Sequence, residues 1–236
     1  MLRRAALLSL LGLWLALLTG CNPLVVDAPH NPTSSTGSSY LPYVLVNGQI
    51  MRWTRTNVAV SIDTTNLPVG WSPVYEQYVL DGLQQWQGNS GGALSFSRVD
   101  SNANISIRWV YQISGTANAT GETEIALMEN RFLPPSIALA TAVGGQPISN
   151  AEMRATAIHE LGHAIGLFGH SPNSQDVMFA SSAAVRLSSN DIATLLDLYS
   201  HEAQIWQVDA QFASVRDAQV IRIYKAQTLR NSASRP

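Results

Sequence analysis

The stretch from Ala157 to Pro172, AIHELGHAIGLFGHSP, constrains the fold more than any other part of this 236-residue sequence. His159 and His163 are four residues apart, so on a helix they lie one above the other, about one turn apart. Two imidazoles placed in this way can converge on one metal ion, as a zinc site requires. Glu160 lies roughly 100° further round the helix, where it can reach a metal-bound water but is not a natural ligand. The stretch therefore predicts a helix that carries two metal ligands and a general base.

This helix is predicted to run from Ser149 to about Gly166. Ser149 and Glu152 have the spacing of a capping box at its beginning. The helix is expected to bury one apolar face and to present the histidines on the other. That apolar face is formed by Met153, Ala157, Ile158, Leu161, Ala164 and Ile165.

Three further features follow the two histidines. Gly166 can take the left-handed conformation that ends a helix and turns the chain. His170 comes directly after that turn, and Met178 follows within the run SQDVMFA. With these residues the sequence resembles the metzincin clan of zinc endopeptidases, and within it the matrixins. The family pattern is HExxHxxGxxH, followed by a turn with a buried methionine beneath the metal.

The resemblance implies one catalytic Zn²⁺ and a role for each matching residue. Zinc ligands would be His159, His163 and His170, with Glu160 as general base and acid, Gly166 at the turn and Met178 as the turn methionine. The closing helix of matrixins, with its Leu-Ser and Asp-Ile pairs, is similar to the run LSSNDIATLLDLY that starts at Leu187. The implied fold is a metzincin-like catalytic domain, with a twisted mixed sheet, two main helices, one of them the active-site helix, the methionine turn and a C-terminal helix.

The sequence departs from the family pattern between Gly166 and His170, where three residues stand instead of two. One additional residue in extended chain would turn the His170 side chain away from the metal. We expect Gly169 to adopt positive φ and to absorb this residue as a bulge, which keeps His170 as the third ligand. The competing ligands are Asp176 and Glu202, of which Glu202 would make the site similar to the gluzincins. We expect both carboxylates to be solvated at the surface.

The order of predicted elements indicates an α+β domain over residues 40–201. An Asn-Gly pair at 47–48 predicts a hairpin, and a helix over 71–88 is expected to have Ser72 as N-cap and Pro73 at its first position. A helix over 188–200 begins at a capping-box pair, Ser188 and Asp191. Strand-like runs lie at 57–63, 94–100, 104–110 and, more weakly, 136–143.

The N-terminus predicts export. Arg3 and Arg4 precede an apolar run, Ala5 to Leu18, that is shorter than the roughly 20 residues of a membrane span. Residues 1–20 therefore form a signal peptide, and the end of this run, LLTGC, resembles the lipobox of bacterial lipoproteins. The resemblance implies lipidation of Cys21, the only cysteine, and a membrane anchor at the cell envelope. Without lipidation of Cys21 the protein would be secreted.

Two segments flank the domain. Residues 21–39 are rich in Pro, Ser, Thr and Gly and are predicted to form a flexible tether. Residues 202–236 form a C-terminal extension, with either a further helix or a packed segment over 202–227. Its last part, residues 228–236, is expected to be a disordered tail.

Composition limits the partners. The net charge is −2 and only 13% of residues are charged, so no basic face is available for nucleic acid. We expect a monomer. The matrixin resemblance implies a polypeptide substrate, extended along an edge strand with one side chain in a pocket beside the metal. Residues 179–187 would form the wall of that pocket, with Phe179, Ala180, Ser181 and Val185 as candidate contacts.

The leading hypothesis is an extracytoplasmic zinc-dependent endopeptidase that hydrolyses peptide bonds. The alternatives are a non-catalytic binding module that keeps the fold and the metal, and a gluzincin-like zinc hydrolase with a carboxylate as third ligand. Glu160 favours an enzyme, because a purely structural zinc prefers four protein ligands and needs no base. A cysteine switch of the matrixin kind is excluded, since Cys21 is the only cysteine.

Overall fold

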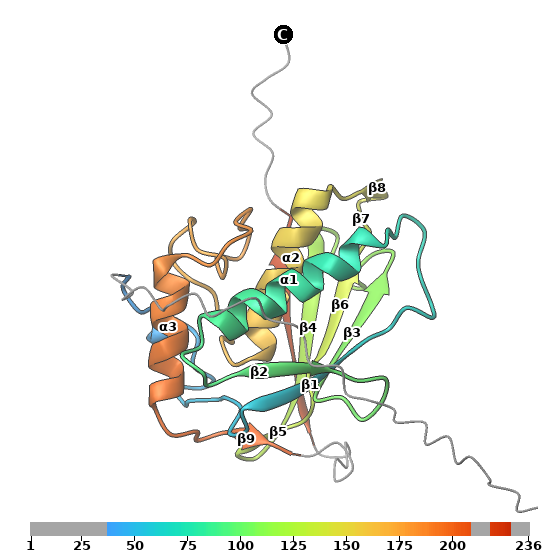
Figure 1. The fold of residues 1–236 in the computed structure, drawn as a ribbon. Helices are drawn as coiled ribbons and strands as arrows, with labels where there is room; N and C mark the ends of the chain where they lie inside the picture. The colour runs from blue at the N-terminus through green and yellow to red at the C-terminus, as the bar shows by residue number, and fades with distance from the viewer. Residues whose placement is uncertain (1–36, 209–217, 228–236) are drawn as a thin grey trace, which may run out of the picture.

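The computed structural model describes residues 37–208 and 218–227 (Figure 1). One twisted sheet forms the centre, and helices α1 and α2 lie side by side across one of its faces. The helical elements are η1 (Leu41–Tyr43), α1 (Val74–Gly88), α2 (Asn150–Ala164) and α3 (Ser189–Ser200). The strands are β1 (Asn57–Ile62), β2 (Ser95–Arg98), β3 (Ile105–Val110), β4 (Ala119–Met128), β5 (Arg131–Phe132), β6 (Ser136–Ala140), β7 (Ala142–Val143), β8 (Gln146–Pro147), β9 (Trp206–Gln207) and β10 (Gln219–Ala226).

The central strands have the order β2-β1-β3-β6-β4. The first four are parallel to one another, and β4 runs antiparallel to β6. Strand β10 pairs antiparallel with β4 along the opposite edge, since residues 121–124 of β4 have one partner in β6 and another in β10. Strands β5 and β9 extend the sheet beyond one end of β4, and β7 and β8 form a separate two-stranded sheet. The predicted α+β class with a mixed sheet is confirmed.

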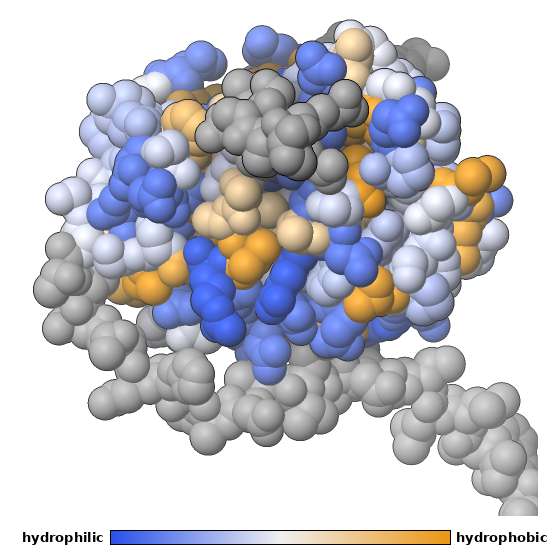
Figure 2. All heavy atoms as spheres, turned by 90° about the horizontal axis from the view of Figure 1, so that it is seen from above, coloured by the Kyte–Doolittle hydropathy of each residue, from blue (hydrophilic) through white to orange (hydrophobic). Residues whose placement is uncertain are grey.

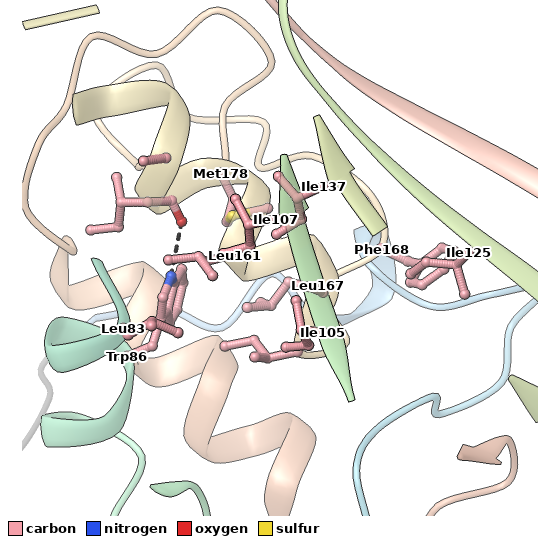
Figure 3. Packing of buried hydrophobic residues seen from close by; sticks show 14 of the residues in the cluster. Leu83, Trp86, Ile105, Ile107, Ile125, Ile137, Leu161, Leu167, Phe168 and Met178 are labelled. Carbon is pink, nitrogen blue, oxygen red and sulfur yellow. Dashed lines mark hydrogen bonds between the residues drawn. The ribbon is translucent and has the colours of Figure 1, made fainter. Parts of the chain in front are cut away.

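The core lies between the sheet and the two packed helices. Trp86 of α1 donates its indole N–H to the carbonyl of Ile158 in α2, at 2.9 Å (Figure 3). Leu83 of α1 and Leu161 of α2 lie beside this bond, and the apolar side chains of β3 and β6 close the layer from the sheet. This packing fixes the position of α2 relative to the sheet, and with it the position of the histidines.

The strand predictions at β1, β2, β3 and β6 are confirmed. The expected hairpin is reduced to a tight turn, in which Asn47 and Gly48 have φ of 50° and 77° and Val46 forms an isolated bridge with Gln49. Strand β4 was not predicted. Its sequence, ATGETEIALM, has few of the alternating apolar residues by which strands are recognised.

Helix α1 begins at Val74, with Pro73 in the capping position and no side-chain cap bond, so the prediction of Ser72 as N-cap is wrong. The capping box of α3 is confirmed, with Ser188 and Asp191 bonded reciprocally. The buried side of α3 is formed by Asp191, Thr194, Leu195 and Leu198. Ile192, Leu196 and Tyr199 of the same helix are only half-buried.

The segments that flank the domain contribute to it where the structure describes them. Ser38 and Ser39, assigned to the tether, hydrogen-bond to Asn190 and Asp197 of α3. Within 202–227 the described residues form β9 and β10, so the packed extension is correct and the helix is wrong. The signal peptide, Cys21 and residues 228–236 lie outside the described residues.

The described surface is largely polar. Figure 2 shows hydrophobic residues in small separate groups among hydrophilic ones on the face seen from above. In the described ranges, no helix has both the length and the apolar character needed to cross a membrane.

Candidate metal centre

Helix α2 carries the first two histidines and is more deeply buried than predicted. Ser149 caps it by accepting a hydrogen bond from the backbone N–H of Glu152, and Gly166 follows it with φ of 116°, as expected. Both faces of the helix are covered, and His159, Glu160 and His163 each have an exposed fraction of 0%. The expectation of an open face is therefore wrong, because β4 and β10 pack against this side of α2.

The hydrogen bonds of the two helical histidines define their tautomers. Nδ1 of His159 lies 2.7 Å from the carbonyl of Val177, and Nδ1 of His163 lies 2.6 Å from the carbonyl of Leu167. A carbonyl only accepts, so both Nδ1 atoms carry the hydrogen and both Nε2 atoms keep a free lone pair when the rings are neutral. These two Nε2 atoms face each other at 3.1 Å.

Burial keeps the three rings neutral. It lowers the pKa of His163 to about 3 and that of His159 well below the ordinary value, with neighbouring imidazoles as a second cause. Burial also lowers the pKa of His170. Without a proton between them, two opposed lone pairs at 3.1 Å repel each other, and a cation between them removes that repulsion.

His170 completes the group. Its Nε2 atom is buried and has no hydrogen-bond partner among the described residues. One nitrogen from each of the three histidines lies within 4.8 Å of the other two. Zinc binds imidazole nitrogen at about 2.0–2.1 Å and, in catalytic sites, takes three protein ligands and leaves one position open. The donor set and its convergence therefore fit a zinc ion.

Gly169 serves this geometry in a different way from the one predicted. It does not have positive φ, so the expected bulge is wrong. A Cβ atom at this position would overlap the carbonyl oxygen of Tyr43, and the N–H of Phe168 donates to the carbonyl of Val44. The lengthened loop is held against the segment that follows η1, and only glycine permits this close approach.

Met178 is fully buried and its side chain lies against α2 at Gly162, between the two helical histidines in the sequence (Figure 3). A Cβ atom on Gly162 would overlap its Sδ atom, so the glycine between the two histidines makes room for this side chain. The carboxylate of Asp191 accepts hydrogen bonds from the N–H groups of Val177 and Met178, at 2.8 and 3.4 Å. The turn is thereby tied to the beginning of α3.

The competing carboxylates do not join the histidines. Asp176 has an exposed fraction of 1% and accepts hydrogen bonds from the hydroxyls of Ser171 and Ser188, at 2.5 and 2.7 Å. Its predicted place as a solvated carboxylate is wrong, since it organises the loop that carries His170. Glu202 is exposed, as expected. Among the described residues, the group of potential ligands consists of the three histidines.

Glu160 lies beside this group with both carboxylate oxygens bonded. Oε2 accepts from the hydroxyl of Thr123 at 2.6 Å, and Oε1 accepts from the backbone N–H of Lys225 at 3.2 Å. Burial raises the pKa of Glu160 to about 8, although the Thr123 bond and the charge of Lys225 act in the opposite direction. A cation held by the adjacent histidines would favour the ionised form.

The four pocket candidates, Phe179, Ala180, Ser181 and Val185, are half-buried. The carbonyl of Ala180 accepts from the N–H of Ala226 in β10 at 2.9 Å, whereas the carbonyl of Val185 accepts from the side chain of Gln85 in α1. Ala180 thus lies beside the strand next to Glu160. The contacts of Thr123 and Lys225 were missed, because β4 and β10 were not recognised as strands.

Three neutral histidines, an adjoining glutamate and a buried methionine turn define a domain of the zinc-metallopeptidase type. Comparison with protein families agrees with this class, since the family model described as Matrixin matches residues 52–200. The chain belongs to the matrixin family. A search of curated proteins finds no match to the chain.

Proposed function

We propose that the protein is a zinc-dependent endopeptidase that acts outside the cytoplasm. The observation that carries the proposal is the convergence of three imidazole nitrogens, with the buried Glu160 directly after His159 on the same helix. His159, His163 and His170 would hold the ion. A zinc ion held by these residues would polarise a carbonyl and lower the pKa of a bound water to about 7.

Glu160 is the general base and acid of the proposed reaction. It takes a proton from the attacking water and delivers it to the amide nitrogen that leaves. The contact with the N–H of Lys225 supports this role, because it places a peptide nitrogen within hydrogen-bond distance of Oε1. The hydroxyl of Thr123 holds the other oxygen and so fixes the orientation of the carboxylate. Phe179 follows the turn methionine and offers no side-chain donor to a developing oxyanion.

The substrate is proposed to be a polypeptide bound in extended form along the edge of β4 that β10 occupies in the structure. An edge strand offers a row of N–H and C=O groups to which another chain adds by backbone hydrogen bonds. A chain in this place would lie between β4 and Ala180, because the carbonyl of Ala180 accepts from the N–H of Ala226 in β10.

Metal analysis and peptide digestion test the proposal together. Wild type is expected to bind one zinc and to cut a peptide mixture about 10² to 10⁴ times faster than Glu160→Gln, which removes the base. The proposal is lost if the two proteins hold equal zinc and cut at equal rates, which would leave the non-catalytic binding module.

The third ligand is tested by zinc affinity. His170→Ala should weaken zinc binding, whereas Glu202→Ala should not, since Glu202 is exposed and away from the histidines. The opposite order would favour the gluzincin-like alternative.

The location rests on the N-terminal sequence. We propose that Cys21 is lipidated and anchors the exported protein to a membrane, and that the protein works as a monomer. Cys21→Ser should move the protein from the membrane fraction to the soluble fraction. An unchanged distribution would refute the anchor.

A further inference from the structure

Strand β10 has an unusual distribution of buried and exposed residues. Val220 is 42% exposed, and Ile221 and Ile223 are only half-buried, although these are the apolar residues of the strand. Lys225 is its one buried residue, with an exposed fraction of 0%. A strand that serves only the core buries its apolar side chains and leaves lysine in water. On β10, Ile221 and Ile223 pack only partly against the core, and the deepest burial belongs to a lysine.

The main chain of β10 lies along the edge of β4 next to Glu160. It pairs with β4 from Gln219 to Lys225, and the register shifts between Lys225 and Ala226. At this shift the N–H of Lys225 donates to Glu160, and the N–H of Ala226 donates to Ala180 on the opposite side. The strand thus runs between β4 and the segment after Met178, in the position proposed for a substrate.

The side chain of Lys225 ends at an acidic group on α2. Its Nζ atom donates to Oε1 of Glu152 at 2.7 Å, and Glu152 lies in the first turn of the helix that carries the histidines. A buried lysine is tolerated when a carboxylate compensates the loss of hydration. The space filled by Lys225 therefore has the chemistry of a specificity pocket for a basic side chain, with Glu152 at its end.

We propose that β10 is an inhibitory strand bound in the substrate position, and that Glu152 makes the enzyme select lysine immediately after the cleaved bond. The inference rests on the proposed function and names the substrate class and the regulation of the same site. In this alignment the bond between Tyr224 and Lys225 corresponds to the cleaved bond, since its nitrogen contacts Glu160.

The contacts of Glu160 explain why the strand inhibits. Thr123 and the N–H of Lys225 occupy both carboxylate oxygens, and the group is fully buried. While β10 stays in place, this burial keeps a separate peptide and its attacking water away from the carboxylate. Because β10 belongs to the same chain, it competes with a separate peptide at an effective concentration on the order of millimolar. A substrate reaches β4 only after β10 has left it.

The experiment compares full-length, zinc-loaded wild type with Lys225→Glu and Arg222→Glu. Lys225→Glu places a negative charge against Glu152, whereas Arg222 pairs with Glu124 on the exposed side of the same strand. The two variants are matched charge reversals that differ in burial. Circular dichroism and zinc content check that each variant folds, and Lys225→Gln replaces Lys225→Glu if it does not.

Two measurements are made on each protein. The first is cleavage of a fluorogenic peptide that contains one lysine, and the second is hydrogen exchange of the β10 and β4 amides. Lys225→Glu should increase both rates at least about tenfold, because breaking a buried ion pair is far more costly than breaking an exposed one. Arg222→Glu should stay within about fivefold of wild type.

A binding assay makes the inference independent of turnover. The probe is a labelled peptide with the sequence of residues 218–227, AQVIRIYKAQ. It should bind Lys225→Glu and not wild type, and a copy with alanine in place of its lysine should bind at least about tenfold more weakly. If the Lys225→Glu strand exchanges freely while cleavage and binding stay at the wild-type level, β10 is not an inhibitor. Rapid self-cleavage before Lys225 would also overturn inhibition.

The outcomes separate the two proposals. If the peptide binds Lys225→Glu alone but no protein cleaves any substrate, the proposed endopeptidase activity is refuted. The proposal that β10 occupies a peptide-binding position is then retained. If wild type and Lys225→Glu cleave at equal rates that depend on Glu160, the endopeptidase stands and the inhibitory strand is lost.

Discussion

Strands β6 and β10 flank the same strand, β4, but attach to it in different ways. On β6, Ile137, Ala138 and Leu139 are buried and belong to the core. On β10, the apolar residues are half-buried or exposed and Lys225 alone is buried. Both strands use antiparallel backbone pairing with β4. Both strands are thus bound to β4 by backbone hydrogen bonds. They differ in side-chain burial, which makes β6 part of the core and fits β10 to the role of an exchangeable strand.

This difference in side-chain burial explains how β4 can keep β6 permanently and yet exchange β10 for another peptide. Apolar burial at β6 is lost only when the domain unfolds, because the side chains interlock with α2. At β10 another peptide with the same backbone and a lysine offers equivalent bonds.

Truncation of an apolar residue on each strand should give unequal losses of stability. Leu139→Ala is expected to lower the free energy of unfolding by about 2–5 kcal/mol, because it leaves a cavity in the core. Ile223→Ala should lower it by about 1 kcal/mol, since Ile223 is only half-buried. Urea unfolding of the zinc-loaded proteins measures both values. Equal losses would mean that β10 is a core strand like β6.

Removal of the charge on Glu152 should weaken the preference for lysine. Glu152→Gln is expected to reduce the ratio of kcat/KM for a lysine peptide to that for its alanine counterpart by about 2 kcal/mol, or roughly 30-fold, because the charged hydrogen bond is lost. Glu124→Gln is the matched control, since Glu124 faces the exposed side of β4 and pairs with Arg222. An unchanged ratio in Glu152→Gln would show that Glu152 does not select the side chain.

The burial of Glu160 beneath β10 should appear in the pH dependence of stability without metal. Its pKa of about 8 in the folded chain lies above the usual value of about 4.3, so the folded state holds the extra proton between these limits. The stability that this proton contributes is present at low pH and is lost as the pH rises. Relative to Glu160→Gln, wild type should lose up to about 1.4 kcal/mol between pH 6 and pH 7.

The histidines do not disturb this comparison, because both proteins carry them. Urea unfolding at the two pH values gives the slopes, and the same pair of proteins in a Lys225→Glu background should differ less, since release of β10 hydrates Glu160. Parallel curves for wild type and Glu160→Gln would contradict the raised pKa.

The smallest effect is expected at the exposed ion pair of β10. Arg222→Ala removes the bond to Glu124, in which both side chains are more than a third exposed. The loss should be below about 1 kcal/mol and should shrink further in high salt. A larger loss in thermal unfolding would show that surface charge, rather than Lys225, holds the strand.

Much of the site could be predicted from local sequence. The spacing of His159, Glu160 and His163 determines which side of a helix they share, and the caps at Ser149 and Ser188 mark where helices begin. His170 joins the other two histidines as expected. The reason for Gly169 was missed, because its close contact is with Tyr43, more than a hundred residues earlier.

The pairing of β10 with β4 could not be predicted, because the two strands lie far apart in the sequence. Strand β4 lacks alternation, since its polar residues Thr120 and Thr123 are buried and hydrogen-bond to Thr156 and Glu160 of α2. The segment that forms β10 has alternating apolar residues at 221 and 223, a pattern equally open to a packed strand in another place. Its position is given by the backbone pairing with β4 and by the contacts of Lys225 with Glu152 and Glu160.

If Glu160 performs the chemistry beside three zinc-binding histidines once β10 is released, its removal must abolish the activity of the released enzyme. The most direct test is kcat/KM for a lysine peptide, compared between Lys225→Glu and the double variant Lys225→Glu with Glu160→Gln, each holding one zinc. The double variant is expected to be slower by a factor of about 10² to 10⁴. Equal rates in the two proteins would contradict this role of Glu160.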